Sequence, residues 1–166
     1  MTTEQSTHTL SVYVANRPGV LARIAQVFSR RGYNIESLVV SPAKDGEFSR
    51  MTIGLSGSAD GLEQIILQVG KLVDVLSCVD HSDDSAVVRE MALVKVRVDA
   101  EHRVEVLQIV EHFACKTVDL TDTSMIIMST GASEKVNAFI RMMRSFDVIE
   151  LVRTGKVLMA RGDQPT

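Results

Sequence analysis

The feature of this sequence that most constrains its fold is an order of strand-like and helix-like segments that occurs twice. Alternating apolar and polar residues predict half-buried strands, and apolar residues every three or four positions predict helices. The first half predicts strands at 8–14, 35–40, 48–55 and 73–79, with helices whose apolar faces lie within 20–28 and 62–72. The second half predicts strands at 87–98, 117–120, 125–129 and 148–152, with helices at 103–114 and 133–144.

A repeated βαββαβ unit predicts an α+β protein of two ferredoxin-like domains in tandem, each a sheet with its helices on one face. We place the boundary in the polar stretch 81–85, which gives domains 1–82 and 83–166. A domain of about 80 residues buries a core worth only about 3–5 kcal/mol. We therefore expect pairing through a free sheet face or edge, as an obligate homodimer.

Composition excludes several classes of function. A net charge of -3 and few aromatic residues argue against a nucleic-acid surface, because phosphate binding needs clustered positive charge. The sequence has no apolar stretch long enough to span a membrane, and residues 1–7 lack the features of a signal peptide. Cys78 and Cys115 have no metal-binding or CxxC spacing and are expected to be free buried thiols. These features favour a cytoplasmic protein.

The stretch from Asn16 to Leu21 connects the first strand to the first helix and is the strongest candidate for binding. Asn16 is suited to capping the turn, and Pro18 to the first helical position. Gly19 allows a ligand to approach the backbone closely. The amides of Gly19, Val20 and Leu21 would face a carboxylate at the positive end of the helix. A plain strand-to-helix turn is the alternative interpretation.

The sequence offers no catalytic constellation and no metal site. Its histidines lack ligand spacing, and no phosphate-binding or nucleophile motif is present. A small ferredoxin-like enzyme using Glu36 or Asp119 as acid or base is an alternative, although a lone carboxylate lacks a catalytic partner. RNA binding through sheet aromatics would need more rings than Tyr13 and Phe48 provide.

Several segments resemble a known family. The Asn16-x-Pro-Gly-Val-Leu turn is similar to the amino-acid-binding signature of ACT domains. A narrower resemblance is to the small regulatory subunit of acetohydroxyacid synthase (acetolactate synthase), and extends from about residue 8 to residue 162. It is carried by the segments 31–38, 49–53, 71–75 and 89–96, by Arg153-Thr154-Gly155 and by Arg161-Gly162.

This resemblance implies a non-catalytic subunit with an N-terminal ACT domain. Such a subunit binds the catalytic large subunit, raises its activity and confers feedback inhibition by valine in branched-chain amino-acid biosynthesis. Thiamine diphosphate, Mg²⁺ and FAD belong to the catalytic partner, so no cofactor is expected in this chain. In the family the ACT domains pair edge to edge, and L-valine binds at their interface. A free-standing tandem ACT sensor of another enzyme, or of transcription, is the alternative function.

The resemblance places valine on the first turn of the first helix. Its carboxylate would bind the amides of Gly19, Val20 and Leu21. Leu21 and Ile35 would line an apolar slot for the isopropyl group.

The ammonium group of valine would bind an asparagine. The acceptor would be the side-chain oxygen of Asn16, or of Asn34 from the paired subunit. The second half has no Asn-x-Pro-Gly turn, so we assign no valine site there.

Overall fold

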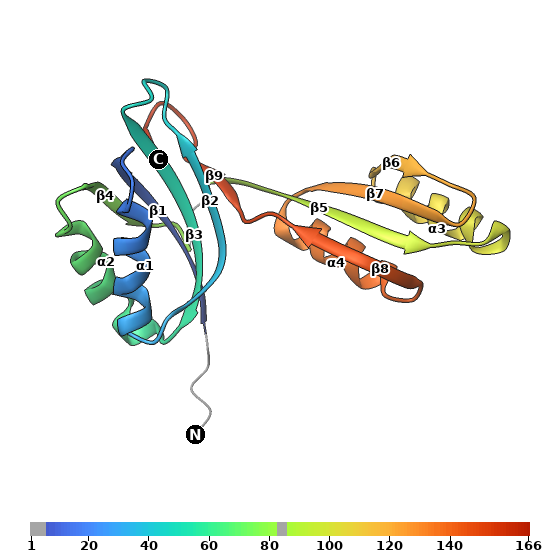
Figure 1. Ribbon diagram of the computed structural model, residues 1–166, viewed down its shortest axis with the longest axis horizontal. Coiled ribbons are helices and arrows are strands. Elements are labelled where there is room, and N and C mark those ends of the chain that lie inside the picture. The colour runs from blue at the N-terminus through green and yellow to red at the C-terminus, as the bar shows by residue number, and fades with distance from the viewer. Residues whose placement is uncertain (1–5, 83–85) are drawn as a thin grey trace. The chain divides into compact units, whose positions relative to one another are not determined.

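The computed structural model describes residues 6–82 and 86–166, which form two compact units (Figure 1). The first unit is Met1–Val87 together with Gly155–Thr166, and the second is Val88–Thr154. The expected boundary at 82/83 adjoins residues 83–85, which lie outside the described residues. The units differ from the expected domains 1–82 and 83–166 because the chain returns to the first unit after the second is complete.

The first unit has the predicted βαββαβ order. Its elements are β1 (Ser6–Ala15), α1 (Val20–Arg30), β2 (Asn34–Pro42), β3 (Phe48–Gly57), a 3-10 turn (Ala59–Gly61), α2 (Leu62–Gly70) and β4 (Val75–Asp80). The strands form an antiparallel sheet in the order β2-β3-β1-β4. Helices α1 and α2 both cover one face of it (Figure 1). The ferredoxin-like fold is confirmed for this unit.

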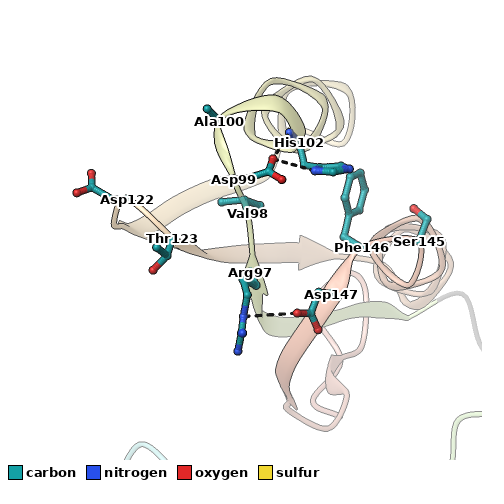
Figure 2. A pocket seen from close by; sticks show the side chains of 10 residues that line it. All are labelled: Arg97, Val98, Asp99, Ala100, His102, Asp122, Thr123, Ser145, Phe146 and Asp147. Carbon is teal, nitrogen blue, oxygen red and sulfur yellow. Dashed lines mark hydrogen bonds and ion pairs between the residues drawn. The ribbon is translucent and has the colours of Figure 1, made fainter.

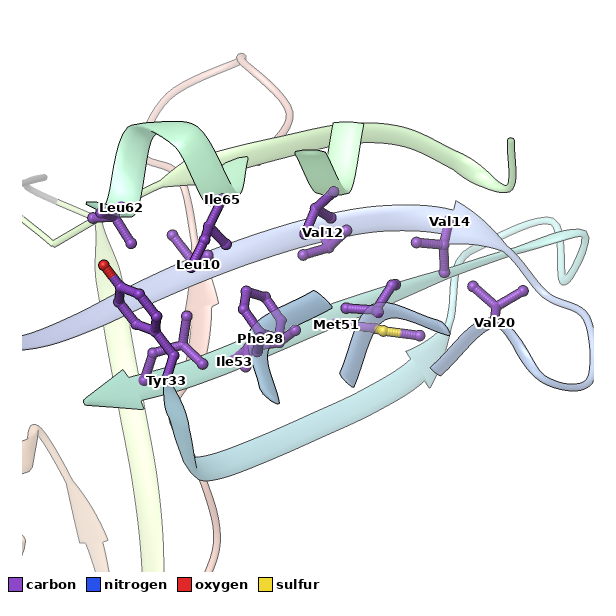
Figure 3. Packing of buried hydrophobic residues seen from close by; sticks show 13 residues of the cluster. Leu10, Val12, Val14, Val20, Phe28, Tyr33, Met51, Ile53, Leu62 and Ile65 are labelled. Carbon is purple, nitrogen blue, oxygen red and sulfur yellow. The ribbon is translucent and has the colours of Figure 1, made fainter. Parts of the chain in front are cut away.

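The core of the first unit follows from strand alternation. Leu10, Val12 and Val14 of β1 point to the helices, and Figure 3 shows them among side chains from α1, α2 and β3. Phe28 of α1 is fully buried in this cluster. Truncating a buried phenylalanine to alanine typically costs about 3–5 kcal/mol. Burial of the Phe28 side chain therefore contributes strongly to the packing of α1 on the sheet.

The second unit repeats the plan. Its elements are β5 (Val87–Arg97), α3 (Ala100–His112), β6 (Lys116–Leu120), β7 (Ser124–Gly131), α4 (Ser133–Met143) and β8 (Asp147–Arg153). The sheet order is β6-β7-β5-β8, the counterpart of the first sheet. A separate core fills the space between this sheet and its helices. The strand β9 (Val157–Met159), which follows β8 and belongs to the first unit, pairs with β5 and was not predicted.

Local differences from the sequence prediction concern the ends of elements. Helix α1 begins at Val20 with Gly19 as its N-cap, so Pro18 precedes the helix instead of occupying its first position. Gly32 follows the C-cap with φ 73°, the left-handed conformation that favours glycine after a helix. Helix α3 begins earlier than expected, at Ala100, because the Asp99 side chain caps it.

Candidate functional site

The turn between β1 and α1 leaves the start of the helix without a side-chain cap. Gly19 has φ 83°, a conformation that favours glycine, and no side chain accepts a hydrogen bond at this N-cap. The Val20 amide reaches the Arg17 carbonyl only at 3.5 Å, a long hydrogen bond. Because the first N–H groups of a helix have no intrahelical acceptor, this turn can bind an anion.

Asn16 holds this turn against the turn between β2 and β3. Its Nδ2 donates to the carbonyl of Gly46 at 3.0 Å, and its backbone N–H donates to Glu47 at 2.9 Å. The sequence suggested that Asn16 caps the turn, but its side chain does not cap α1. Because its nitrogen makes this bond, the Oδ1 atom is the end suited to accept from an ammonium group.

A guanidinium lies one helical turn after Gly19, and sequence analysis missed it. Arg23 forms an ion pair with Asp74, which precedes β4. The Nη1 atom of Arg23 lies 3.5 Å from where a Cβ on Gly19 would be. The spacing of four residues could have indicated this proximity, whereas the pairing with Asp74 is visible only in the fold. The positive charge adds to the attraction of the turn for a carboxylate.

Asn34 and Ile35 lie at the other end of α1. The helix has 11 residues, about 16 Å at 1.5 Å per residue, so these two do not join Gly19 within one chain. Asn34 Nδ2 donates to Glu36 Oε1 at 2.7 Å. The Oδ1 atom of Asn34 therefore points away from Glu36. The structure of one chain thus brings together Asn16, Gly19, Val20 and Leu21 only.

Strand β2 is an edge strand of the first sheet, hydrogen-bonded to β3 on one side. Antiparallel pairing of two β2 edges about a twofold axis would set the start of one strand beside the end of the other. The end of β2 leads into the turn that contains Gly46, whose carbonyl accepts the hydrogen bond from Asn16. A paired copy would thus bring its Asn34 and Ile35 to this turn. Leu21, 37% exposed, is available for contact there.

The alternative acid or base candidates, Glu36 and Asp119, are both exposed, the first on β2 and the second on β6. The exposed carboxylate of Glu36 accepts from Ser56 Oγ at 2.5 Å and from Asn34, and these hydrogen bonds, Ser56's first, lower its pKa. Burial, and secondarily Asp80, raise the pKa of the Cys78 thiol to about 12, which makes it unreactive. Residues 6–82 and 86–166 contain no cluster of three metal-ligating side chains. In the same ranges, no helix is long and apolar enough to cross a membrane.

The second unit has a pocket of about 620 Å³ at the corresponding turn, between β5 and α3 (Figure 2). Here the helix start is occupied: Asp99 Oδ1 accepts from the amides of Glu101 and His102 at 3.1 and 2.8 Å. The same oxygen lies 2.8 Å from His102 Nδ1. Arg97 pairs with Asp147 at 3.5 Å across the pocket. The arrangement disfavours a carboxylate ligand at this turn.

Comparison with known proteins gives the family of this fold. Residues 10–77 match a family model described as the AHAS (acetohydroxyacid synthase) small subunit-like ACT domain. Residues 89–162 match a model described as the small subunit of acetolactate synthase. The chain belongs to the acetolactate synthase small-subunit family. The second match extends beyond the second unit into the returning segment.

Relatives within the small-subunit family cover nearly the whole chain. The acetolactate synthase small subunit of Mycolicibacterium smegmatis is 44% identical over 94% of this chain and 92% of its own length. The probable acetolactate synthase small subunit of Archaeoglobus fulgidus is also 44% identical, over 95% of this chain and 98% of its own. The crystal structure of the acetolactate synthase small subunit from Thermotoga maritima matches with a TM-score of 0.84 at 40% identity, covering 96% of this chain and 99% of that one.

Proposed function

We propose that this chain is the non-catalytic regulatory subunit of acetolactate synthase. It binds the catalytic large subunit, raises its activity and confers feedback inhibition by L-valine. The observation that carries the valine assignment is the turn at Gly19, where an uncapped helix start, a positive-φ glycine and a nearby guanidinium favour one carboxylate. Thiamine diphosphate, Mg²⁺ and FAD are assigned to the catalytic partner, and none to this chain.

The proposed site forms between two copies of the first unit. One copy supplies the amides of Gly19, Val20 and Leu21 for the carboxylate, with Arg23 nearby. The ammonium group binds Asn16 Oδ1 and the partner's Asn34. Leu21 and the partner's Ile35 line the slot for the isopropyl group. This division of roles follows from the 11-residue helix that separates the two ends of the site within one chain.

The mechanism is linkage between valine and quaternary structure. A ligand bound across two subunits stabilises the dimer arrangement that contains the complete site, whereas activation requires the arrangement that the catalytic subunit binds. Valine therefore inhibits when these two arrangements differ. The second unit supports the assembly and holds no valine. A cytoplasmic location remains the prediction from the sequence.

A matched pair of substitutions tests the site. Gly19→Ala and Gly19→Asp both place a Cβ on a residue with positive φ, and aspartate tolerates this conformation at least as well as alanine, so backbone strain alone would not weaken Gly19→Asp more. Only Gly19→Asp adds a carboxylate where that of valine would bind. Side-by-side like charges cost several kcal/mol, so we expect Gly19→Asp to bind valine about 100-fold more weakly than Gly19→Ala.

Isothermal titration calorimetry with L-valine, and with D-valine as control, measures this difference. Reconstitution with the catalytic subunit measures activation, which both variants should retain. Equal valine affinity in the two variants would refute the placement of the carboxylate. A chain that binds valine but neither binds nor activates the catalytic subunit would instead be a free-standing ACT sensor.

A further inference from the structure

The outer face of the first sheet, opposite α1 and α2, is polar but buried. Strand alternation places Thr9, Ser11 and Thr52 on this face, and all three are at most 6% exposed. No described helix of this unit lies there. The segment Gly155–Thr166, which we call the strap, contacts this face and belongs to the first unit. Figure 1 shows it returning to this sheet from β8.

The strap enters across one row of residues in the sheet. Thr9 of β1 and Ser37 of β2 both pair with Gly54 of β3, which has no side chain. Gly155 lies on Ser37: a Cβ on Gly155 would be 3.0 Å from Ser37 Cβ and 3.2 Å from the Leu38 backbone nitrogen. Lys156 Nζ donates to Thr9 Oγ1 at 3.3 Å.

The far end of the strap is also fixed to the sheet. Arg50 of β3 donates to the carbonyl of Thr166 and stacks on the Tyr13 ring at 5.0 Å. The Thr166 hydroxyl accepts from the Ala160 amide at 2.8 Å, which closes a loop at the end of the chain. Leu158 is buried although it belongs to neither hydrophobic core. The strap thus contacts three strands of the first sheet and is a packed part of the first unit.

The position of the strap on β2 bears on the effector site. The pairing of β2 with β3 shifts register between Ile35 and Ser37, so the strand is irregular directly after Asn34 and Ile35. A bulged edge strand has fewer ladder hydrogen bonds to hold it. Gly155 packs on Ser37 and Leu38, immediately beyond this irregularity. The strap therefore supports the strand that would carry the partner's half of the valine site.

We infer that the strap Gly155–Thr166 is a conformational coupling device. When seated, it holds the bulged edge strand β2 in the geometry that completes the effector site; when displaced, it loosens that strand. Because the strap directly follows β8, a displacement of the second unit's last strand reaches β2 through a few residues of chain. The effector part of this inference rests on the proposed function, whereas the effect on β2 does not.

Amide hydrogen exchange of the full-length dimer tests the device. Gly155→Val should displace the strap, because backbone and side-chain atoms of β2 leave no room for its methyl groups. Lys156→Met is a milder second variant that keeps the aliphatic stem and removes only the hydrogen bond to Thr9. Gly70→Val is the matched control, since a Cβ there meets no atom within 4 Å. We expect exchange of residues 34–42 to rise about tenfold in Gly155→Val and less in Lys156→Met, with the second unit unchanged.

A rise confined to the strap itself, with β2 as protected as in the parent chain, would overturn the inference. Valine titration of the same variants gives the second readout: affinity should fall at least about fivefold in Gly155→Val and stay unchanged in Gly70→Val. If the parent chain binds no valine, the proposed effector is refuted, and the exchange experiment still decides whether the strap holds β2. If β2 loosens but valine affinity stays the same, the coupling is refuted.

Discussion

The two units share one fold but differ at the same turn, between the first strand and the first helix. In the first unit the N-cap is Gly19, and no side chain caps the helix. In the second unit the carboxylate of Asp99 accepts from two backbone amides at the start of α3. A built-in carboxylate thus occupies in one unit the position that we propose for the carboxylate of valine in the other. The capping residue, more than the fold, therefore distinguishes the proposed valine turn from its counterpart in the second unit.

The arginine at the fourth position of each helix supports the same contrast. Arg23 reaches Asp74 and lies beside the open turn at Gly19. Arg103 instead donates to the carbonyl of Asp122 at 2.6 Å, in the turn between β6 and β7. Arg103 thus binds a neighbouring turn in the second unit, whereas Arg23 lies beside the uncapped helix start in the first unit. The comparison explains why a duplicated fold has one proposed valine site per chain.

The largest expected effect is on the free energy of unfolding when the arginine of an ion pair in the second unit is removed. In the second unit the side chain of Glu90 is only 4% exposed, and it accepts from Arg153 Nε at 2.7 Å and Ser133 Oγ at 2.6 Å. Arg153→Met would leave this carboxylate buried with the hydroxyl alone, so we expect the free energy of unfolding to fall by about 3 kcal/mol in urea denaturation.

Two further variants control this prediction. Arg23→Met in the first unit removes an arginine that is 50% exposed, and should cost about 1 kcal/mol or less. Adding Glu90→Gln to Arg153→Met should recover part of the loss, because a neutral amide is cheaper to bury than an unpaired charge. An equal cost for Arg23→Met and Arg153→Met would contradict this difference between the units.

A heterodimer of two different variants tests the proposal that the valine site at the Gly19 turn is completed by a second copy of the chain. Asn34→Ala removes a hydrogen bond to the ammonium group, and hydrogen bonds to charged groups are worth about 1.5–3 kcal/mol, so valine affinity should fall at least about tenfold. Gly19→Asp damages the other half of the site. A heterodimer of the two variants keeps one undamaged site, formed by Gly19 of one chain and Asn34 of the other.

Calorimetry of the purified heterodimer should therefore show one valine bound with the parent affinity, whereas neither homodimer binds at that affinity. If the two halves of the site came from the same chain, every site in the heterodimer would be damaged, and no binding would return. That result would refute the shared site while leaving the fold unaffected.

The smallest effect concerns the closed turn of the second unit. The pKa of Asp99 is lowered, chiefly by the hydrogen bond from the His102 amide, and the pKa of His102 is raised, chiefly by its hydrogen bond to Asp99. The contribution of Asp99 to stability is lost as pH falls through its lowered pKa, and that of His102 as pH rises through its raised pKa. The pair therefore stabilises α3 most between these two values.

NMR titration of His102 checks this interaction. In Asp99→Asn the pKa of His102 should return toward its ordinary value of 6.5, because the negative charge of its partner is gone. A His102 pKa that stays raised in Asp99→Asn would show that other carboxylates, such as Glu105, are its main partners.

Local pattern was enough to predict most of the fold. Strand alternation predicted the buried side of β1, and the helices and strands expected in both halves lie at nearly the correct residues. The sequence also indicated the turn at Gly19 as a candidate site. It misjudged what Asn16 does, because a side chain that bonds a turn thirty residues away leaves no local signal.

The sequence by itself determined the duplicated order of elements and the glycine that opens the start of α1, because these depend on residues within a few positions of each other. Only the tertiary structure decided that Arg23 meets Asp74, that Asn34 lies a helix length away from Gly19 and that the last residues return to the first sheet. Such contacts join residues far apart in the chain, where neither periodicity nor turn chemistry specifies the partner, and packing selects it.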